Sequence, residues 1–312
     1  MNVPVSTPLR VVAFVAALAA AFAVAWGGGR LVGPIDTEPV AHEGMADHGD
    51  EHASAAAVAD VGGLTARADG YTLALADHTL DAGRTRLDFQ VLTSGGRPLL
   101  DYTREHDKDL HLIVVRRDLT GFQHVHPTLD TATGTWSTDV RLTPGVWRVI
   151  ADLTPEGWDG ITLADDVAVA GAFRPDDLPA DDRTATVDTD EGTYTVTLEG
   201  DTAPGASTVL TTSIELDGAP VADLEPYLGA FGHLVALRAG DLGYLHVHPE
   251  DGEPGPGIDF ATAFATPGTY RLFLDFQHRG VVRTAAFTVE SGGAPGASTS
   301  LDHQGEGEGH DH

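Results

Sequence analysis

The sequence predicts an all-β protein in which two tandem antiparallel β-sandwiches follow one N-terminal transmembrane helix. Three observations carry this prediction. An uninterrupted apolar run lies between two arginines near the N-terminus. Beyond it, short segments of alternating polar and apolar residues are separated by turns rich in Gly and Pro, which is typical of antiparallel sandwiches. These segments form two similar blocks, residues 67–171 and 193–290, so we expect two domains of the same immunoglobulin-like type.

The N-terminal segment, residues 1–33, is expected to be a membrane anchor. Its apolar run from Val11 to Gly29 contains 19 residues and would span about 28 Å as a helix, close to the thickness of a bilayer core. Arg10 precedes the run and acidic residues follow it, which predicts a cytoplasmic N-terminus and an extracytoplasmic remainder at the cell membrane. Small residues in "AFAVA" leave a cleaved signal peptide as the alternative. Both interpretations predict that the rest of the chain lies outside the cytoplasm.

The charge and the cysteine count exclude several classes of protein. The formal net charge is −29, so the chain is not expected to bind nucleic acid or to dock on anionic lipid through a basic patch. Cysteine is absent, which excludes disulfides and thiolate metal sites. Any bound metal must therefore be held by His, Met, Asp or Glu.

Polar segments separate and flank the two blocks. Residues 34–66 are expected to form a flexible stalk, residues 172–192 an acidic linker and residues 291–312 a disordered tail. The stalk and the tail are rich in potential metal ligands, namely His42, Met45, His48, His52, His303, His310 and His312. Because a disordered segment has no core to pack, these side chains favour metal binding over a structural role.

The two blocks share one series of strands. Each opens with a Tyr-Thr strand, "YTLAL" or "YTVTL", and continues with "HLIVVR" or "HLVALR". Each later has a Pro-Gly turn that leads into a strand ending in Asp, "VWRVIAD" or "TYRLFLD". Helical periodicity is nearly absent after the anchor, and only "LEPYLGAF", residues 224–231, is expected to form one short helical turn.

A His-x-His-Pro motif occurs once in each block, as "HVHP". On a strand, residues i and i+2 share one face, so the two histidines of each motif should project together. A third histidine precedes each motif by 13 and 15 positions, which a hairpin would bring alongside. The spacing therefore predicts two three-histidine metal sites: His111, His124 and His126, and His233, His246 and His248.

His278 is the expected fourth ligand of the second site. It ends the strand "TYRLFLDFQH", whose apolar face should point inward. Counted from the Pro-Gly turn, the first block has Pro155 at the matching position, which cannot ligate through its side chain. Glu105 and His106 precede the first-block strand instead. Four imidazoles can close a coordination sphere and three leave it open, so the second site should bind metal more tightly.

The segments "HLIVVRRDLTGFQHVHP" and "TPGTYRLFLDFQHRGVVRTAAFTV" resemble the YtkA-like/FixH-like β-sandwich domains of bacterial membrane-anchored proteins. The resemblance covers about residues 67–290. It implies a cupredoxin-like or CopC-like sandwich in a copper or heavy-metal context, and it supports the same seven histidines as site residues. The chain departs from the family pattern in its doubled domain, and one copy lacks the equivalent of His278. It also lacks the Cys-His-Met set of blue copper sites, so electron transfer is not expected.

These observations predict a non-enzymatic, membrane-anchored extracytoplasmic protein that buffers or delivers copper, with zinc as the alternative metal. A second envelope copper protein is a candidate partner. The same histidines would also suit a structural or interaction module of the cell envelope, in which they only pack. A metalloenzyme is the third class, but no phosphate-binding loop or nucleophile elbow occurs in the sequence.

Overall fold

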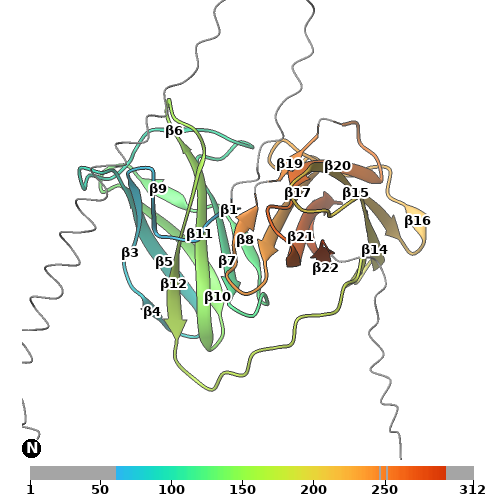
Figure 1. Ribbon diagram of the computed structural model, residues 1–312, viewed down its shortest axis with the longest axis horizontal. Helices are drawn as coiled ribbons and strands as arrows, with labels where there is room; N and C mark the ends of the chain where they lie inside the picture. Colours follow the sequence, from blue (N-terminus) through green and yellow to red (C-terminus); the bar gives the residue numbers. More distant parts are fainter. Residues whose placement is uncertain (1–60, 246, 251, 293–312) are drawn as a thin grey trace, which may run out of the picture. The chain divides into compact units, whose positions relative to one another are not determined.

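The computed structural model describes residues 61–245, 247–250 and 252–292. Every secondary-structure element within these residues is a β-strand (Figure 1), which confirms the predicted all-β architecture of two tandem domains. The predicted anchor, most of the predicted stalk and all but the first two residues of the predicted tail lie outside the described residues. Among the residues that are described, no helix is long and apolar enough to cross a membrane.

The first block is a sandwich of two sheets around a core that contains Phe89, Trp136 and Trp147. One sheet has the strand order β2 (Arg67–Ala68), β3 (Tyr71–Leu75), β5 (Gly83–Leu92), β10 (Thr135–Leu142) and β9 (Thr128–Asp130). The other has the order β4 (Thr79–Leu80), β12 (Ile161–Val169), β11 (Gly145–Pro155), β7 (His111–Arg116) and β8 (Gln123–Val125), and β6 (Tyr102–Thr103) pairs with β11.

The second block repeats this arrangement around a core that contains Tyr194, Phe260 and Phe287. Its first sheet has the order β13 (Thr184–Thr189), β14 (Gly192–Glu199), β15 (Ser207–Leu216), β20 (Gly257–Ala263) and β19 (His248–Pro249), and β16 (Ala219–Pro220) pairs with β15. Its second sheet has the order β1 (Val61–Gly62), β18 (Tyr244–Leu245), β17 (Gly232–Arg238), β21 (Gly268–His278) and β22 (Val281–Ser291). Pairing between the named strands of both blocks is antiparallel, apart from the parallel pair β4–β12.

Two strands form within segments that the sequence analysis treated as stalk and linker. β1 lies in the expected stalk, yet its backbone pairs with β18 of the second block and so covers a sheet edge. β13 begins inside the expected acidic linker. There Ala185 is buried while its neighbours Thr184 and Thr186 are exposed, and this alternation is the signature of a half-buried strand.

The helical turn expected at residues 224–231 is not formed, and that prediction is wrong. Tyr227 and Ala230 instead exchange backbone hydrogen bonds around Leu228 and Gly229, which both have positive φ. Pro226 disfavours a helical conformation of the residue before it, and Gly229 adopts a positive φ without a steric penalty. The first block has the same tight turn, in which Glu105 and Lys108 exchange hydrogen bonds.

The two blocks also pack against each other, and the described residues all belong to one compact unit. A third apolar cluster joins the outer face of the β7–β11–β12 sheet to that of the β17–β18–β21 sheet. Ile113 and Val235 belong to this cluster, and the rings of Phe122 and Phe273 stack with centroids 4.0 Å apart. β7 and β17 are thus buried on both faces, which explains why both read as continuous apolar runs.

Candidate metal centre

The hairpin of β7 and β8 places three histidines on the face that meets the second block. Its register pairs Leu112 with Val125 and Ile113 with His124, so His111, His124 and His126 project from the same side as Ile113. The connecting turn depends on Gly121, which has a φ of +67°. A Cβ at this position would lie 2.5 Å from Cη2 of the Trp147 ring, so no larger residue fits there without displacement.

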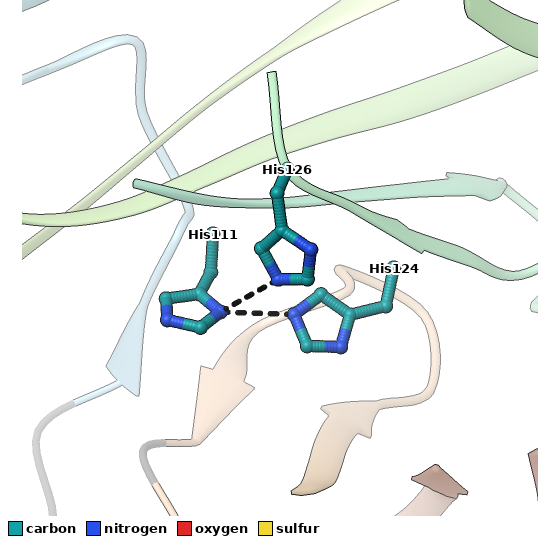
Figure 2. A group of neighbouring side chains, drawn as sticks. All are labelled: His111, His124 and His126. Carbon is teal, nitrogen blue, oxygen red and sulfur yellow. Dashed lines mark hydrogen bonds between the residues drawn. The ribbon is translucent and has the colours of Figure 1, made fainter. Parts of the chain in front are cut away.

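The ring nitrogens of these three histidines, here called the triad, converge on one point (Figure 2). Nδ1 of His111 lies 3.0 Å from Nε2 of His124 and 3.2 Å from Nε2 of His126. One ligand atom of each residue lies within 4.8 Å of the other two. Nitrogens bound tetrahedrally to one ion at about 2.0–2.1 Å would be about 3.3 Å apart. The triad could therefore bind a metal ion after shifts of a few tenths of an ångström.

Hydrogen bonds on the far side of two rings determine which nitrogens face the centre. Nε2 of His111 donates to the backbone oxygen of Glu105 at 3.1 Å, and Nδ1 of His124 donates to the Asp275 carboxylate at 3.0 Å. A carbonyl and a carboxylate can only accept, so these nitrogens carry the protons. In neutral rings, His111 Nδ1 and His124 Nε2 then present two lone pairs to each other across 3.0 Å. A cation between the rings relieves this repulsion, as in sites where metal-binding histidines donate their other N–H.

The carboxylate that orients His124 comes from the second block. Asp275 lies on β21, and its second oxygen accepts a hydrogen bond from the Thr284 hydroxyl on β22. The side chains of His124 and Asp275 are only 4% and 7% exposed, so water has little access to their hydrogen bond. The triad therefore depends on both blocks, although all three imidazoles belong to the first.

Burial keeps several of these imidazoles uncharged. Desolvation, followed by the neighbouring histidines, lowers the pKa of His126 from 6.5 to about 2. Desolvation is also the main cause that lowers the pKa of His111. It lowers the pKa of His233 to about 4, against an opposing hydrogen bond to the backbone of Tyr227. Neutral imidazole is the form that binds metal, so these shifts favour ligation near neutral pH.

His233 is the part of the predicted second site that the structure describes best. It lies on β17, 7% exposed, and its Nε2 donates to the Tyr227 backbone oxygen at 2.7 Å. Its ring centroid is 6.2 Å from that of His111 and 6.0 Å from that of His124, so it borders the triad. His246 lies outside the described residues, and of His248 only the backbone is described, paired with Ala261. A second triad thus stays a prediction.

The structure does not bring His278 to His233, the described histidine of the predicted second site, because His233 pairs with Asp275 and that residue lies on the other face of β21. Its Nδ1 lies 2.7 Å from the Tyr194 hydroxyl and its Nε2 lies 3.2 Å from the Asp223 carboxylate. The side chain is 2% exposed and shares the core-facing side of β21 with Phe276, opposite to Asp275. β11 and β21 have the same length and end at Pro155 and His278, as the repeat indicated.

A cavity of about 40 Å³ adjoins the triad. Its walls include two acidic side chains and four imidazoles, namely Glu105, Asp152, His106, His111, His124 and His233. The sequence analysis did not single out Asp152 or Asp275 as parts of the site. The available signal was the Asp at the same position of the two strands that follow the Pro-Gly turns, because Asp152 pairs in register with His111 and Asp275 pairs with His233.

Comparison with known proteins identifies a family of unassigned activity. A family model described as "Domain of unknown function (DUF8832)" matches residues 66–169 and again residues 185–293. The matches account for most of the chain and treat the two blocks as copies of one domain. No curated protein matches the chain. The resemblance to YtkA-like or FixH-like domains stays a prediction.

Three solved structures illustrate how distant the structural relatives are. An alpha-2-macroglobulin variant from Salmonella has 15% identity and a TM-score of 0.25, with 74% of this chain and 15% of that chain covered. The adhesin InvE from Yersinia pseudotuberculosis has 11% identity and a TM-score of 0.20, with 70% and 58% covered. A protein from Corynebacterium diphtheriae described as membrane anchored has 11% identity and a TM-score of 0.21, with 73% and 60% covered. Similarity at these values assigns no activity.

Proposed function

The chain belongs to the family described as a domain of unknown function (DUF8832), and from its histidine cluster we propose that it is an extracytoplasmic metal-binding protein that buffers or delivers copper. One observation carries this proposal. Ring nitrogens of His111, His124 and His126 lie within 4.8 Å of one another, and His111 and His124 each donate their outer N–H to a fixed acceptor. When both of those rings are neutral, their inner nitrogens present lone pairs to each other across 3.0 Å, an arrangement that a bound cation stabilises.

Copper is the expected metal and zinc the alternative. The triad offers only imidazole nitrogens, which suit both ions, and the chain has no cysteine that would select a softer site. Three protein ligands leave a coordination position for water or for a ligand from another protein. An open position suits transfer of the ion to a partner, and a second envelope copper protein remains the candidate for that role.

We further propose that the protein is not an enzyme and is held at the membrane by residues 11–29. The apolar run and its flanking charges support the anchor. A hydrolytic metal site needs a general base beside the open position. Glu105 borders the neighbouring cavity, but one of its carboxylate oxygens accepts a hydrogen bond from the Thr154 hydroxyl. That bond supports a structural role for Glu105 over a catalytic one.

A structural role for the histidines is the competing function, and the His124–Asp275 bond favours it. This buried hydrogen bond joins the two blocks and would do so without any metal. The two functions differ in what the triad contributes. A metal-binding triad determines ion affinity, whereas a purely structural one determines only stability.

Titration of the purified full-length chain distinguishes the two. Cu(I), Cu(II) and Zn(II) are titrated separately against a competing chelator, for the wild type, His126→Ala and His78→Ala. His78 is the control because its side chain is 63% exposed and its Nδ1 contacts Asp166 and Asp165 on β12, away from the triad. We expect His126→Ala to lose one tightly bound ion and His78→Ala to retain it. Equal tight binding by all three proteins, with intact folds, would leave only the structural role.

A further inference from the structure

The cavity beside the triad lies between imidazoles from both blocks. Its volume of about 40 Å³ is more than the roughly 10–15 Å³ that a cavity needs on this measure to hold one water molecule. It therefore has room for an ion together with water ligands. His106 comes from the turn before β7 and His233 from β17, so each block contributes one imidazole beyond the triad.

The spacing of this imidazole pair matches that of rings which share an ion. The centroids of His106 and His233 are 5.0 Å apart, and those within the triad are 4.7 to 5.3 Å apart. With a metal–nitrogen bond of about 2.0 Å, two imidazole centroids at a tetrahedral angle lie about 5 Å apart. His233 stands 6.0 to 6.2 Å from His124 and His111. It is thus better placed to share an ion with His106 than with the triad.

Among the described residues only the triad brings three ligand atoms within 4.8 Å of one another, so an ion in this cavity would have two imidazoles as protein ligands and water in its other positions. Nε2 of His233 donates to a backbone oxygen, which leaves Nδ1 as its ligand nitrogen in the neutral ring. The Glu105 and Asp152 carboxylates also border the cavity, and hydroxyls of Thr154 and Thr162 hydrogen-bond to them.

The turn itself does not require a histidine at position 106. His106 has a φ of 49°, and Leu228 occupies the equivalent position of the second-block turn with a φ of 56°. The same backbone conformation therefore accepts an aliphatic side chain. The turn therefore does not explain why residue 106 is a histidine. The ring of His106 contacts those of His111 and His233.

We propose that this cavity is a second metal position, in which His106 and His233 bind an ion next to the one in the triad, so that the centre is dinuclear and shared by the two blocks. The proposal rests on the proposed function, because it extends the same centre. It differs from the second site predicted from the sequence, since its ligands come from both blocks.

The experiment counts tightly bound ions on the full-length chain. Wild type, His106→Leu, His233→Gln and His126→Ala are loaded with Cu(II) in the presence of a competing chelator, separated by gel filtration and analysed for copper. His106→Leu introduces the residue that the second-block turn already carries, so it should fold, and thermal unfolding checks this. We expect one ion fewer in each variant than in wild type. We also expect electron paramagnetic resonance to show a coupled Cu(II) pair in wild type and an isolated ion in His106→Leu.

Three outcomes would overturn the second position. If His106→Leu and His233→Gln keep the wild-type ion count and coupling while His126→Ala loses an ion, the triad binds metal alone. If His233→Gln weakens affinity without changing the count, His233 is a ligand of the triad's ion. If none of the three substitutions changes copper binding, the proposed function fails together with the second position.

Discussion

Replacing Asp275 with Asn tests whether the second block controls metal binding by the first. The Asp275 carboxylate accepts the Nδ1 proton of His124 at 3.0 Å and thereby leaves Nε2 available to the ion. Asparagine has nearly the same shape but no charge, and its amide can present either an acceptor or a donor. If the NH₂ group faces His124, the ring takes the opposite tautomer and Nε2 becomes protonated.

The expected loss of affinity follows from the burial of this pair. Removing the hydrogen-bonding partner of a metal ligand lowers metal affinity by about 10- to 100-fold, or about 1.4 to 2.8 kcal/mol. A hydrogen bond to a charged group contributes about 1.5–3 kcal/mol. With side chains 4% and 7% exposed, water cannot easily replace the lost bond. We therefore expect a loss near the upper end, about 100-fold.

The assay is competitive Cu(II) and Zn(II) titration of the full-length chain at neutral pH. Asp223→Asn is the matched control, because Asp223 contacts His278 at 3.2 Å, and that histidine lies outside the triad. We expect Asp223→Asn to retain wild-type affinity. If Asp275→Asn, folded as wild type by circular dichroism, binds metal as tightly as the control does, then His124 needs no orienting carboxylate and the argument from its tautomer fails.

Three further predictions concern pH, the flanking segments and His278. The metal-free protein should lose stability as pH falls below about 6.5, because histidines of the unfolded chain then become protonated while buried histidines of the folded protein stay neutral. The pKa of His233 is about 4 in the folded protein, so between pH 6.5 and 4 this residue should lower the free energy of unfolding by about 1.4 kcal/mol for each pH unit. Urea unfolding across pH should therefore give a shallower slope for His233→Gln, and parallel profiles would contradict this. Deleting residues 34–60 and 295–312 should lower the number of weakly bound ions and leave the most tightly bound ion in place. If metal analysis shows that the deletion variant has lost its most tightly bound ion, the ligands of that ion lie in the deleted segments. His278→Ala should lower the melting temperature, because the Tyr194 hydroxyl loses a partner at 2.7 Å, while metal affinity stays unchanged; weaker binding in titration would instead make His278 a ligand.

The sequence predicted the triad well because its geometry is local. Strand alternation and hairpin spacing depend on residues close together in the chain, and they correctly place His111, His124 and His126 on one face. His278 shows the limit of the same method. Its apolar strand face does point inward, but inward means the core of the second block, where Tyr194 and Asp223 hold the ring. Alternation gives the face of a strand and not what lies opposite it.

The packing of the two blocks could not be derived from their separate patterns. β7 and β17 are apolar on both faces, which indicated a second buried surface but not the surface that covers it. The partners turn out to be each other, through Ile113 on one side and Val235 on the other. For that reason the role of Asp275 was missed, since it contacts a histidine 151 positions away in the other block.

The equivalent aspartates of the repeat show that the centre belongs to the pair of blocks. Asp152 and Asp275 occupy matching strand positions, and each accepts a threonine hydroxyl from the next strand. Each also serves the opposite block: Asp275 accepts from His124, and Asp152 accepts from the Tyr244 hydroxyl at 3.0 Å. The first block on its own would retain its histidines but lose the Asp275 carboxylate that orients His124. It would also lose the Tyr244 hydroxyl that donates to Asp152. The metal affinity of an isolated block would therefore describe a different site, and on the proposed function the metal-binding unit is the two blocks together.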